Sequence, residues 1–304
     1  MVKVAVLLAA YNGEKWINEQ IDSILNQENV DIQLYVSCDL STDSTIEILK
    51  KYNDDRIILL PYGERYGAAA PNFYRLIRDV VFTDFDYVAI SDQDDIWMKD
   101  KISSAIQKIN ENNSVGYSSN VTAFWSDGRK KTVIKATPQR EYDFLFESPG
   151  PGCSFVMTKK FATEFQSYMK DKNEYLKKLD WHDWVIYAYA RSKNYTWFID
   201  KVSHMMYRQH GNNQLGANSG LKQLKKRVND ITSGYGINQS VMTIKFLQME
   251  NNEFVKNWLL KGRKGFLYLS SKSKLCRRRR KDQILFKISC IVMYMRNTKM
   301  EVNA

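Results

Sequence analysis

Short apolar runs alternate with longer stretches of helical periodicity along the first 110 residues of the chain. The apolar runs predict buried strands at Val2–Ala10, Ile32–Cys38, Arg56–Leu60 and Tyr87–Ser91. The periodic stretches predict helices at Glu14–Gln27, Asp43–Tyr52, Ala70–Phe82 and Lys99–Asn110. Such a βαβα series builds an α/β fold with a mostly parallel, Rossmann-like sheet covered by helices on both faces. Ligands then bind beyond the carboxyl ends of its strands.

The pattern changes after Asn112. Strands are predicted at Val115–Trp125, Ser154–Thr158, Tyr195–Ile199 and His204–Tyr207, and a helix at Trp181–Arg191. From Leu221 onward the chain is helical in character, with breaks near Gly234, Gly236, Gly262 and Gly265. We therefore expect a domain over residues 1–220, made of a parallel half (1–112) and a mixed half (113–220). A helical C-terminal extension is expected over residues 221–304.

Composition places the chain among globular proteins with a large core. Hydrophobic residues make up 44% of it and aromatic residues 13%, which excludes a disordered or low-complexity chain. The net charge of +11 lies in the last part, because residues 221–304 carry 19 basic and 5 acidic side chains. The first 220 residues therefore have a net charge of −3. This imbalance argues against a main domain that binds nucleic acid, and it suits a catalytic body held at an anionic surface.

Neither the cysteines nor the apolar segments indicate export. Cys38, Cys153, Cys276 and Cys290 have no close-pair spacing, which argues against a zinc knuckle and a disulfide framework. The run Val4–Ala10 is short and no cleavage region follows it, which argues against a signal peptide. No apolar stretch reaches the roughly 20 residues that a spanning helix needs. We expect a cytoplasmic protein.

Three carboxylates follow the fourth predicted strand directly. Asp92, Asp94 and Asp95 lie within four positions, and like charges at this spacing repel one another unless a cation is present. Oxygen-rich clusters of this kind suit Mg²⁺ or Mn²⁺, which bridges carboxylates to a substrate diphosphate. The alternative is a solvated acidic loop that caps the helix at Lys99. The position at a strand end favours the metal.

The ends of the first two strands carry further candidates. The segment Ala9–Gly13 turns from a strand into a helix, where backbone amides can meet an anion. It lacks the GxGxxG spacing, which argues against a dinucleotide-binding oxidoreductase. Asp39, at the tip of the second strand, is available to a nucleobase or a ribose, whereas Asp43 is expected to cap the next helix.

Four stretches together resemble the inverting family 2 glycosyltransferases of the GT-A fold, especially their bacterial rhamnosyltransferase-like branch: AYNGEKWINEQIDSIL, VSCDLSTDST, GERYGAAAPNF and SDQDDIW. The resemblance implies that residues 1–112 bind a nucleotide sugar and residues 113–220 bind the acceptor. Tyr11 and Asp39 would contact the base and ribose, and Arg65 the diphosphate or the base. Asp92 and Asp94 would form the DXD pair, with Asp94 as the direct metal ligand. The second stretch departs from the family pattern at Cys38 and Leu40.

A second constellation runs from Leu179 to Trp184 at the start of a predicted helix. The resemblance places the family's catalytic carboxylate at Asp183, and inversion needs one base that takes the proton of the acceptor hydroxyl. Trp181 and Trp184 flank this carboxylate and are expected to desolvate it and to stack on a sugar. His182 is either an acceptor contact or a packed histidine. Asp180 is expected to cap the helix.

The stretch YRQHGNN, from Tyr207 to Asn213, resembles one in the rhamnosyltransferase-like branch. Arg208 and His210 are then candidates for donor diphosphate contacts, and a neutral imidazole of His210 would complete the metal shell. A histidine that pins the loop is the alternative. The residues that follow, among them Gly216 and Gly220, are expected to form a lid ordered by the donor.

Seven of the ten residues from Lys272 to Lys281 are basic, and the apolar stretch Ile284–Met295 follows them. Together they predict peripheral binding to the anionic inner face of the plasma membrane. The alternative is a helix packed on the catalytic domain or on a second subunit in a homodimer.

These observations predict a metal-dependent inverting glycosyltransferase of bacterial surface polysaccharide synthesis. The resemblance to the family implies rhamnose from dTDP-rhamnose as the favoured donor sugar, with a UDP-hexose as the competitor. A carbohydrate acceptor, lipid-linked, is expected. A nucleotidyltransferase and a non-catalytic polysaccharide- or membrane-binding protein are the alternatives.

Overall fold

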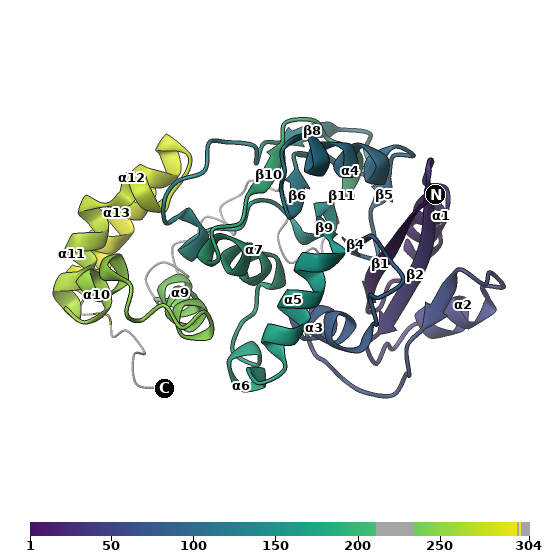
Figure 1. Ribbon diagram of the computed structural model, residues 1–304, viewed down its shortest axis with the longest axis horizontal. Coiled ribbons are helices and arrows are strands. Elements are labelled where there is room, and N and C mark those ends of the chain that lie inside the picture. Colours follow the sequence, from purple (N-terminus) through teal and green to yellow (C-terminus); the bar gives the residue numbers. More distant parts are fainter. Residues whose placement is uncertain (211–233, 297, 299–304) are drawn as a thin grey trace.

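The computed structural model describes residues 1–210, 234–296 and 298, and its centre is a seven-stranded sheet (Figure 1). The strand order is β10-β6-β9-β4-β1-β2-β3, and only β9 runs antiparallel to its neighbours. The strands are β1 (Val2–Ala10), β2 (Val30–Cys38), β3 (Ile57–Leu59), β4 (Tyr87–Ser91), β6 (Gly116–Ser119), β9 (Val156–Thr158) and β10 (Trp197–Asp200). The mostly parallel sheet expected from the alternating pattern is confirmed.

Strand β1 is apolar on both faces because helices cover both sides of the sheet. Ala5 and Leu7 pack in one hydrophobic cluster, whereas Val4, Val6 and Leu8 pack in a second one. The helices of the first half are α1 (Ile17–Leu25), α2 (Thr45–Lys51), α3 (Ala69–Asp79) and α4 (Lys101–Glu111). Helix α3 contributes to the first cluster, and α1, α2 and α4 contribute to the second. This arrangement is why the strands of the first half carry few polar residues before their carboxyl ends.

The second half is mixed, as predicted, but its strands are divided differently. A four-stranded sheet has the order β5-β11-β7-β8, with β5 (Ile96–Trp97), β11 (Met205–Arg208), β7 (Val121–Phe124) and β8 (Lys130–Val133). The single strand predicted at Val115–Trp125 is therefore wrong, because β6 and β7 belong to different sheets. Asn120 separates them: its Nδ2 donates to the carbonyl oxygen of Lys201 (2.7 Å) and its Oδ1 accepts from the amide of Lys135 (2.6 Å).

Three helices of this half pack on the same face of the large sheet as α3. They are α5 (Lys159–Met169), α6 (Asn173–Leu176) and α7 (His182–Ser192), with the short 3₁₀ turns η1 (Asp143–Leu145) and η2 (Gly152–Ser154) before them. Helix α5 was not predicted from the sequence. Its buried residues Phe161, Ala162, Phe165 and Met169 nevertheless repeat at helical spacing, so the periodicity was present in the chain.

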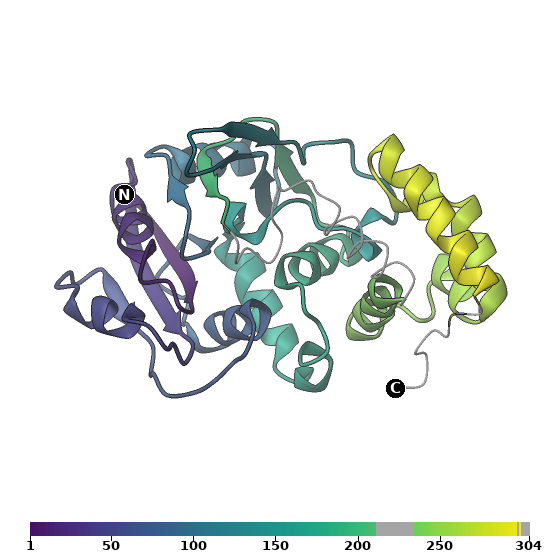
Figure 2. The ribbon, with the colours of Figure 1, turned by 180° about the vertical axis from the view of Figure 1, so that it is seen from behind.

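The C-terminal part is helical, as predicted. Its helices are α9 (Tyr235–Phe246), α10 (Glu253–Leu259), α11 (Arg263–Ser271), α12 (Ser273–Cys276) and α13 (Arg280–Met295). Helices α10 to α13 lie at the opposite end of the molecule from β1, β2 and α2, and α9 lies between them and the body (Figures 1 and 2). They share the hydrophobic cluster of the body, where Phe146 contacts the rings of Phe254 and Trp258. The domain boundary predicted at residue 220 lies outside the described residues.

The glycines of this part have two roles. Gly234 and Gly262 precede α9 and α11, whereas Gly236 and Gly265 lie inside helices, so they are not breaks. A Cβ on Gly265 would lie 1.8 Å from the carbonyl oxygen of Trp258, because α10 and α11 approach each other closely there. Within the described parts of the chain, no helix has the length and apolar character required to span a membrane.

Candidate active site

The carboxyl ends of β4, β1 and β2 are neighbours in the sheet, and this places the loops that follow them side by side. The loop after β1 is clasped to the loop after β4 by Gln93. Its Oε1 accepts from the amide of Tyr11 (2.8 Å) and its Nε2 donates to the carbonyl oxygen of Tyr11 (2.7 Å). Gly13 leaves room for this side chain, since a Cβ there would lie 2.2 Å from Oε1 of Gln93. The phenol of Tyr11 remains 48% exposed.

The anion site expected at the backbone amides after β1 is wrong. The amide of Asn12 donates to Oγ of Ser41 (3.1 Å), and that of Gly13 donates to Oγ1 of Thr45 (2.7 Å). Oδ2 of Asp43 accepts from the next amide, that of Glu14 (3.1 Å). The loop after β2 therefore satisfies these donors. The N-cap residue of α2 is Ser44 and not Asp43 as predicted, although Oδ1 of Asp43 accepts from the amide of Thr45, the first residue of α2 (3.0 Å).

Asp39 is buried at the tip of β2 and accepts three backbone hydrogen bonds. Its Oδ1 accepts from the amides of Leu40 and Tyr66, and its Oδ2 from the amide of Gly67, each at 2.8 Å. The carboxylate thereby holds the loop between β3 and α3 against β2. Arg65 lies in this loop and is exposed. The predicted base and ribose contacts of Asp39 would have to share its carboxylate with these amides.

Burial and mutual repulsion raise the pKa values of two carboxyl groups, Asp92 and Asp95, in the acidic loop after β4. Burial and then the charge of Asp94 raise the pKa of Asp92 to about 7, and the charge of Asp183 adds to this rise. Burial raises the pKa of Asp95 well above its usual range, with Asp94 and Asp92 adding to it. Asp95 is fully buried, and its Oδ1 accepts from the amide of Arg208 (3.0 Å). Asp95 therefore ties the loop to β11 through Oδ1.

Residues from β11 and the segment after it complete this cluster. Nε2 of His210 lies 2.7 Å from Oδ2 of Asp94, and its ring stacks on that of Trp16 with centroids 4.0 Å apart. Nε of Arg208 donates to the carbonyl oxygen of Asp94 (2.8 Å), and its guanidinium also pairs with Glu19. Arg208 thus positions the acidic loop. The sequence predicted the meeting of Asp94 and His210, but it missed Trp16 and Glu19.

The residues of this cluster fit a hard divalent cation. Asp92, Asp95 and Cys153 offer ligand atoms within 4.8 Å of one another, and Oδ2 of Asp95 is buried without a hydrogen-bond partner. The carboxylates and the imidazole of His210 are ligands that Mg²⁺ or Mn²⁺ accepts. Burial raises the pKa of the Cys153 thiol well above its usual range, so this thiol stays protonated and is a poor ligand.

Asp183 lies in the first turn of α7, across from the acidic loop. Its Oδ1 accepts from the amide of Trp184 (2.8 Å), and Oγ of Ser148 donates to its Oδ2 (2.9 Å). Its charge contributes to the raised pKa of Asp92, which places both carboxylates in one region of the molecule. The arrangement thus brings the predicted proton acceptor and the candidate metal ligands into one region. Ser148 is a contact that the sequence did not predict.

The tryptophans and the histidine around Asp183 differ in exposure. Trp184 is buried, and its Nε1 donates to the carbonyl oxygen of Phe144 (2.7 Å), so the predicted stacking of Trp184 on a sugar is wrong. His182 packs on Phe73 with centroids 4.0 Å apart, and burial lowers its pKa to about 4. This contact favours the packed, neutral histidine of the two alternatives. Trp181 is half-buried, and its role as an acceptor contact stays a prediction.

Asp180 does not cap α7, whose N-cap residue is Trp181. Its Oδ2 instead accepts from the hydroxyl of Tyr235 (2.6 Å) and from Nε2 of Gln239 (3.3 Å). Both partners belong to α9. Asp180 therefore joins the C-terminal helices to the helix that carries Asp183.

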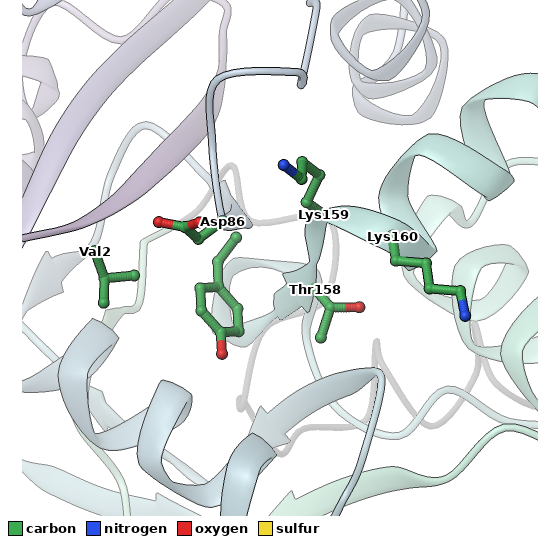
Figure 3. A pocket seen from close by; sticks show the side chains of 6 residues that line it. Val2, Asp86, Thr158, Lys159 and Lys160 are labelled. Carbon is green, nitrogen blue, oxygen red and sulfur yellow. The ribbon is translucent and has the colours of Figure 1, made fainter.

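A surface depression lies at the opposite ends of the central strands of the large sheet (Figure 3). It is lined by Val2, Asp86, Tyr87, Thr158, Lys159 and Lys160. Val2 and Tyr87 are the first residues of β1 and β4, so this depression lies at the amino ends of the parallel strands. Ligands of parallel sheets bind at the carboxyl ends. We therefore assign the depression no part in the active site.

Comparison with known proteins agrees with this geometry. The family model described as glycosyl transferase family 2 matches residues 5–170. The dTDP-rhamnosyl transferase RfbG of Shigella flexneri is 41% identical over 288 residues, which cover 94% of this chain and 99% of that protein. A UDP-Glc:alpha-D-GlcNAc-diphosphoundecaprenol beta-1,3-glucosyltransferase of Escherichia coli, WfaP, is 28% identical over 61% of this chain and 70% of its own length.

Solved structures share the fold at low sequence identity. TarS (residues 1–349) of S. aureus, solved in complex with UDP, has a TM-score of 0.53 and 15% identity, and the match covers 98% of this chain and 89% of that chain. The mannosyltransferase PcManGT of Pyrobaculum calidifontis, in complex with GDP-Man and Mn²⁺, has a TM-score of 0.51 and 14% identity, covering 96% and 86%. The predicted GT-A fold is confirmed.

Proposed function

The chain belongs to glycosyl transferase family 2, and we propose that it moves rhamnose from dTDP-rhamnose to a carbohydrate acceptor with inversion at the anomeric carbon. The observation that carries the donor is the 41% identity to the dTDP-rhamnosyl transferase RfbG along 94% of this chain. Family membership argues against the nucleotidyltransferase and the non-catalytic alternatives. We place the reaction in bacterial surface polysaccharide synthesis.

In the proposed mechanism Asp183 is the base. The acceptor hydroxyl oxygen forms a bond to the anomeric carbon while the bond from that carbon to the diphosphate oxygen breaks, and Asp183 takes the hydroxyl proton. The nucleoside diphosphate leaves with the bonding electrons. Ser148 and the amide of Trp184 hold the carboxylate through its two oxygens. Half-buried Trp181 is the proposed acceptor contact.

The donor side of the site uses the ends of β1, β2 and β4. Tyr11 offers an exposed ring to the base, while Asp39 and Arg65 flank the same site. Asp94, His210 and Asp92 would hold Mg²⁺ or Mn²⁺. A cation bound there neutralises charge on the diphosphate leaving group. Arg208 keeps the acidic loop in place through the carbonyl oxygen of Asp94.

Calorimetric titration of the whole protein with nucleotide sugars tests the donor. In the presence of Mn²⁺ we expect dTDP-rhamnose to bind at least about tenfold more tightly than UDP-glucose or UDP-galactose, a difference of about 1.4 kcal/mol. Binding should be lost in EDTA. Preference for a UDP-hexose would replace the donor assignment with the alternative that the similarity to WfaP supports. Product analysis completes the test, because transfer releases dTDP whereas a nucleotidyltransferase would release pyrophosphate.

We also propose that the protein works at the inner face of the plasma membrane on a lipid-linked acceptor. Helix α13 carries an exposed apolar face, which we call the α13 face, at Ile284, Leu285, Ile288 and Met295. Exposed Arg280, Lys281 and Lys287 lie on the same helix. An apolar stripe with basic neighbours matches the boundary of an anionic bilayer, to which each basic residue adds about 1 kcal/mol. This charge pattern favours lipid over a second copy of the same basic chain.

The double variant Ile284→Glu with Ile288→Glu tests the α13 face. Two acidic groups in place of apolar ones are expected to weaken binding to phosphatidylglycerol vesicles by at least about tenfold, since burial is lost and charge repulsion is added. Co-sedimentation measures the binding. Ile134→Glu with Val202→Glu, which adds the same charge at exposed apolar positions elsewhere, is the matched control.

Equal vesicle binding by the two double variants would exclude the α13 face as the membrane contact. Light scattering on the same samples would detect a homodimer. Loss of a dimer in the α13 variant, with unchanged vesicle binding, would assign the face to a second subunit and overturn the membrane proposal.

A further inference from the structure

Two basic residues just before α13, Arg277 and Arg278, point toward the body of the protein. Nη1 of Arg277 donates to the carbonyl oxygen of Phe146 (2.8 Å), and the amide of Arg278 donates to Oε1 of Glu147 (2.7 Å). The side chain of Arg278 is 3% exposed, and its Nη2 donates to the carbonyl oxygen of Ser148. Two residues of a run expected to face a membrane therefore bind the loop that follows η1.

Two carboxylates balance the charge of Arg278. Its Nε lies 3.8 Å from Oδ2 of Asp143, which is fully buried, and 3.5 Å from Oε1 of Glu147. Asp143 also accepts from the hydroxyl of Tyr187 (3.1 Å) and pairs with Nη1 of Arg191 (3.2 Å), both on α7. A buried guanidinium needs such partners because it has lost its water. The C-terminal segment, the loop and α7 are thus joined by one buried charge network.

Ser148 connects this loop to Asp183. Its Oγ lies 2.9 Å from Oδ2 of Asp183 and 2.6 Å from the carbonyl oxygen of Gly150. A hydroxyl has one proton to donate, so these two acceptors compete for it. Arg278 holds the backbone of Ser148 through its carbonyl oxygen. The position of this backbone therefore determines whether the hydroxyl donates to Asp183 or to Gly150.

We propose that the C-terminal extension completes the catalytic site: Arg278 holds Ser148 in the position from which its hydroxyl donates to Asp183. The inference rests on the proposed role of Asp183 as the base. Arg278 and Ser148 are positioning residues, because they act on the reaction through Asp183. The hydrogen bond keeps the carboxylate in one orientation, from which it takes the proton of the acceptor hydroxyl.

Other titratable groups also face Asp183. Tyr74 of α3, Asp92 after β4, Lys135 after β8 and His182 of α7 all interact electrostatically with it. These groups remain the same when Ser148 is changed. Comparison of the variant with the wild type therefore isolates the contribution of the serine hydroxyl.

The test is steady-state kinetics on the full chain with Ser148→Ala. We expect kcat to fall about tenfold and donor affinity to stay unchanged, because the lost hydrogen bond acts on Asp183, whose proposed partner is the acceptor hydroxyl. Ser148→Thr keeps the hydroxyl and should restore most of the activity.

Arg278→Lys tests the second half of the proposal. Lysine keeps the charge but lacks the planar fork that reaches both Glu147 and the Ser148 carbonyl oxygen. Its kcat should fall to a similar extent, and the double variant with Ser148→Ala should be no slower than the slower single variant. Lys274→Met, which removes an exposed basic residue of the same run, is the control and should behave as wild type.

Wild-type kcat in Ser148→Ala would overturn the proposal, as would multiplicative losses in the double variant. Asp183→Asn is measured in parallel. If that variant is inactive and Ser148→Ala is normal, the positioning role alone fails. If Asp183→Asn is active, the assignment of the base is wrong and the positioning role falls with it.

Discussion

Asp183→Asn is expected to lower kcat by at least about 100-fold while donor affinity stays within about twofold of wild type, because general base catalysis contributes 10²–10⁴-fold. The amide has nearly the same shape and still accepts from the amide of Trp184, which donates to the carboxylate at 2.8 Å in the wild type. It cannot take a proton from the acceptor hydroxyl. Initial rates with a soluble acceptor give kcat, and calorimetry with the donor gives the affinity.

Asp180→Asn provides the matched control for this variant. It makes the same chemical change three residues earlier, in a side chain that bonds Tyr235 of α9 through an oxygen that asparagine retains. We expect near wild-type turnover from it. Normal turnover in Asp183→Asn would remove this residue from the mechanism, and a strong loss of donor affinity would move it to the donor side of the site.

Asp94→Asn is expected to weaken donor binding in Mn²⁺ by about 10- to 100-fold and to lower kcat as well. The residue loses charge at the position where its Oδ2 meets Nε2 of His210, 2.7 Å away. Substitutions in the outer shell of metal sites already cost 10–100-fold in metal affinity, so loss of a direct ligand should cost at least about as much. Titration of Mn²⁺ followed by donor separates the two affinities.

The control for this variant is Asp84→Asn, an exposed carboxylate outside the acidic loop. It should leave both affinities unchanged. If wild type and Asp94→Asn bound the donor equally well with Mn²⁺ and in EDTA, the metal site after β4 would be excluded. The two main variants also distinguish the donor side of the site from the acceptor side, because only Asp94→Asn is expected to weaken donor binding.

The first half of the fold was largely predictable from local pattern. Strand β1 and strand β4 have the predicted bounds, because both are buried on two faces and their apolar runs end abruptly at polar residues. The strand at Val115–Trp125 was wrong for a reason that lies elsewhere in the chain. Asn120 interrupts it through bonds to Lys201 and Lys135, and no local pattern reports such partners.

The sequence likewise determined which chemical groups are available, because the residue type at a strand end or helix start fixes whether that position offers a carboxylate. Asp94 was a candidate because of its position at a strand end, whereas Asp183 became one through the resemblance to the family 2 glycosyltransferases. The tertiary structure decided which side chains around Asp183 are buried in the core and which stay accessible. Trp184 points into the core while Trp181 is half-buried, although both flank the same carboxylate. Sequence pattern does not distinguish them, because burial depends on elements that arrive from far along the chain.

The basic run shows the same division most clearly. Its charge was evident from composition, and that charge alone indicated an anionic surface. The structure directs Arg278 to the loop that carries Ser148, 130 positions earlier in the chain. The buried guanidinium of Arg278 is stabilised there by the carboxylates of Asp143 and Glu147, which lie within reach of it only in the folded chain. Residue types therefore set what this protein can do chemically, and long-range packing decided which of them act together.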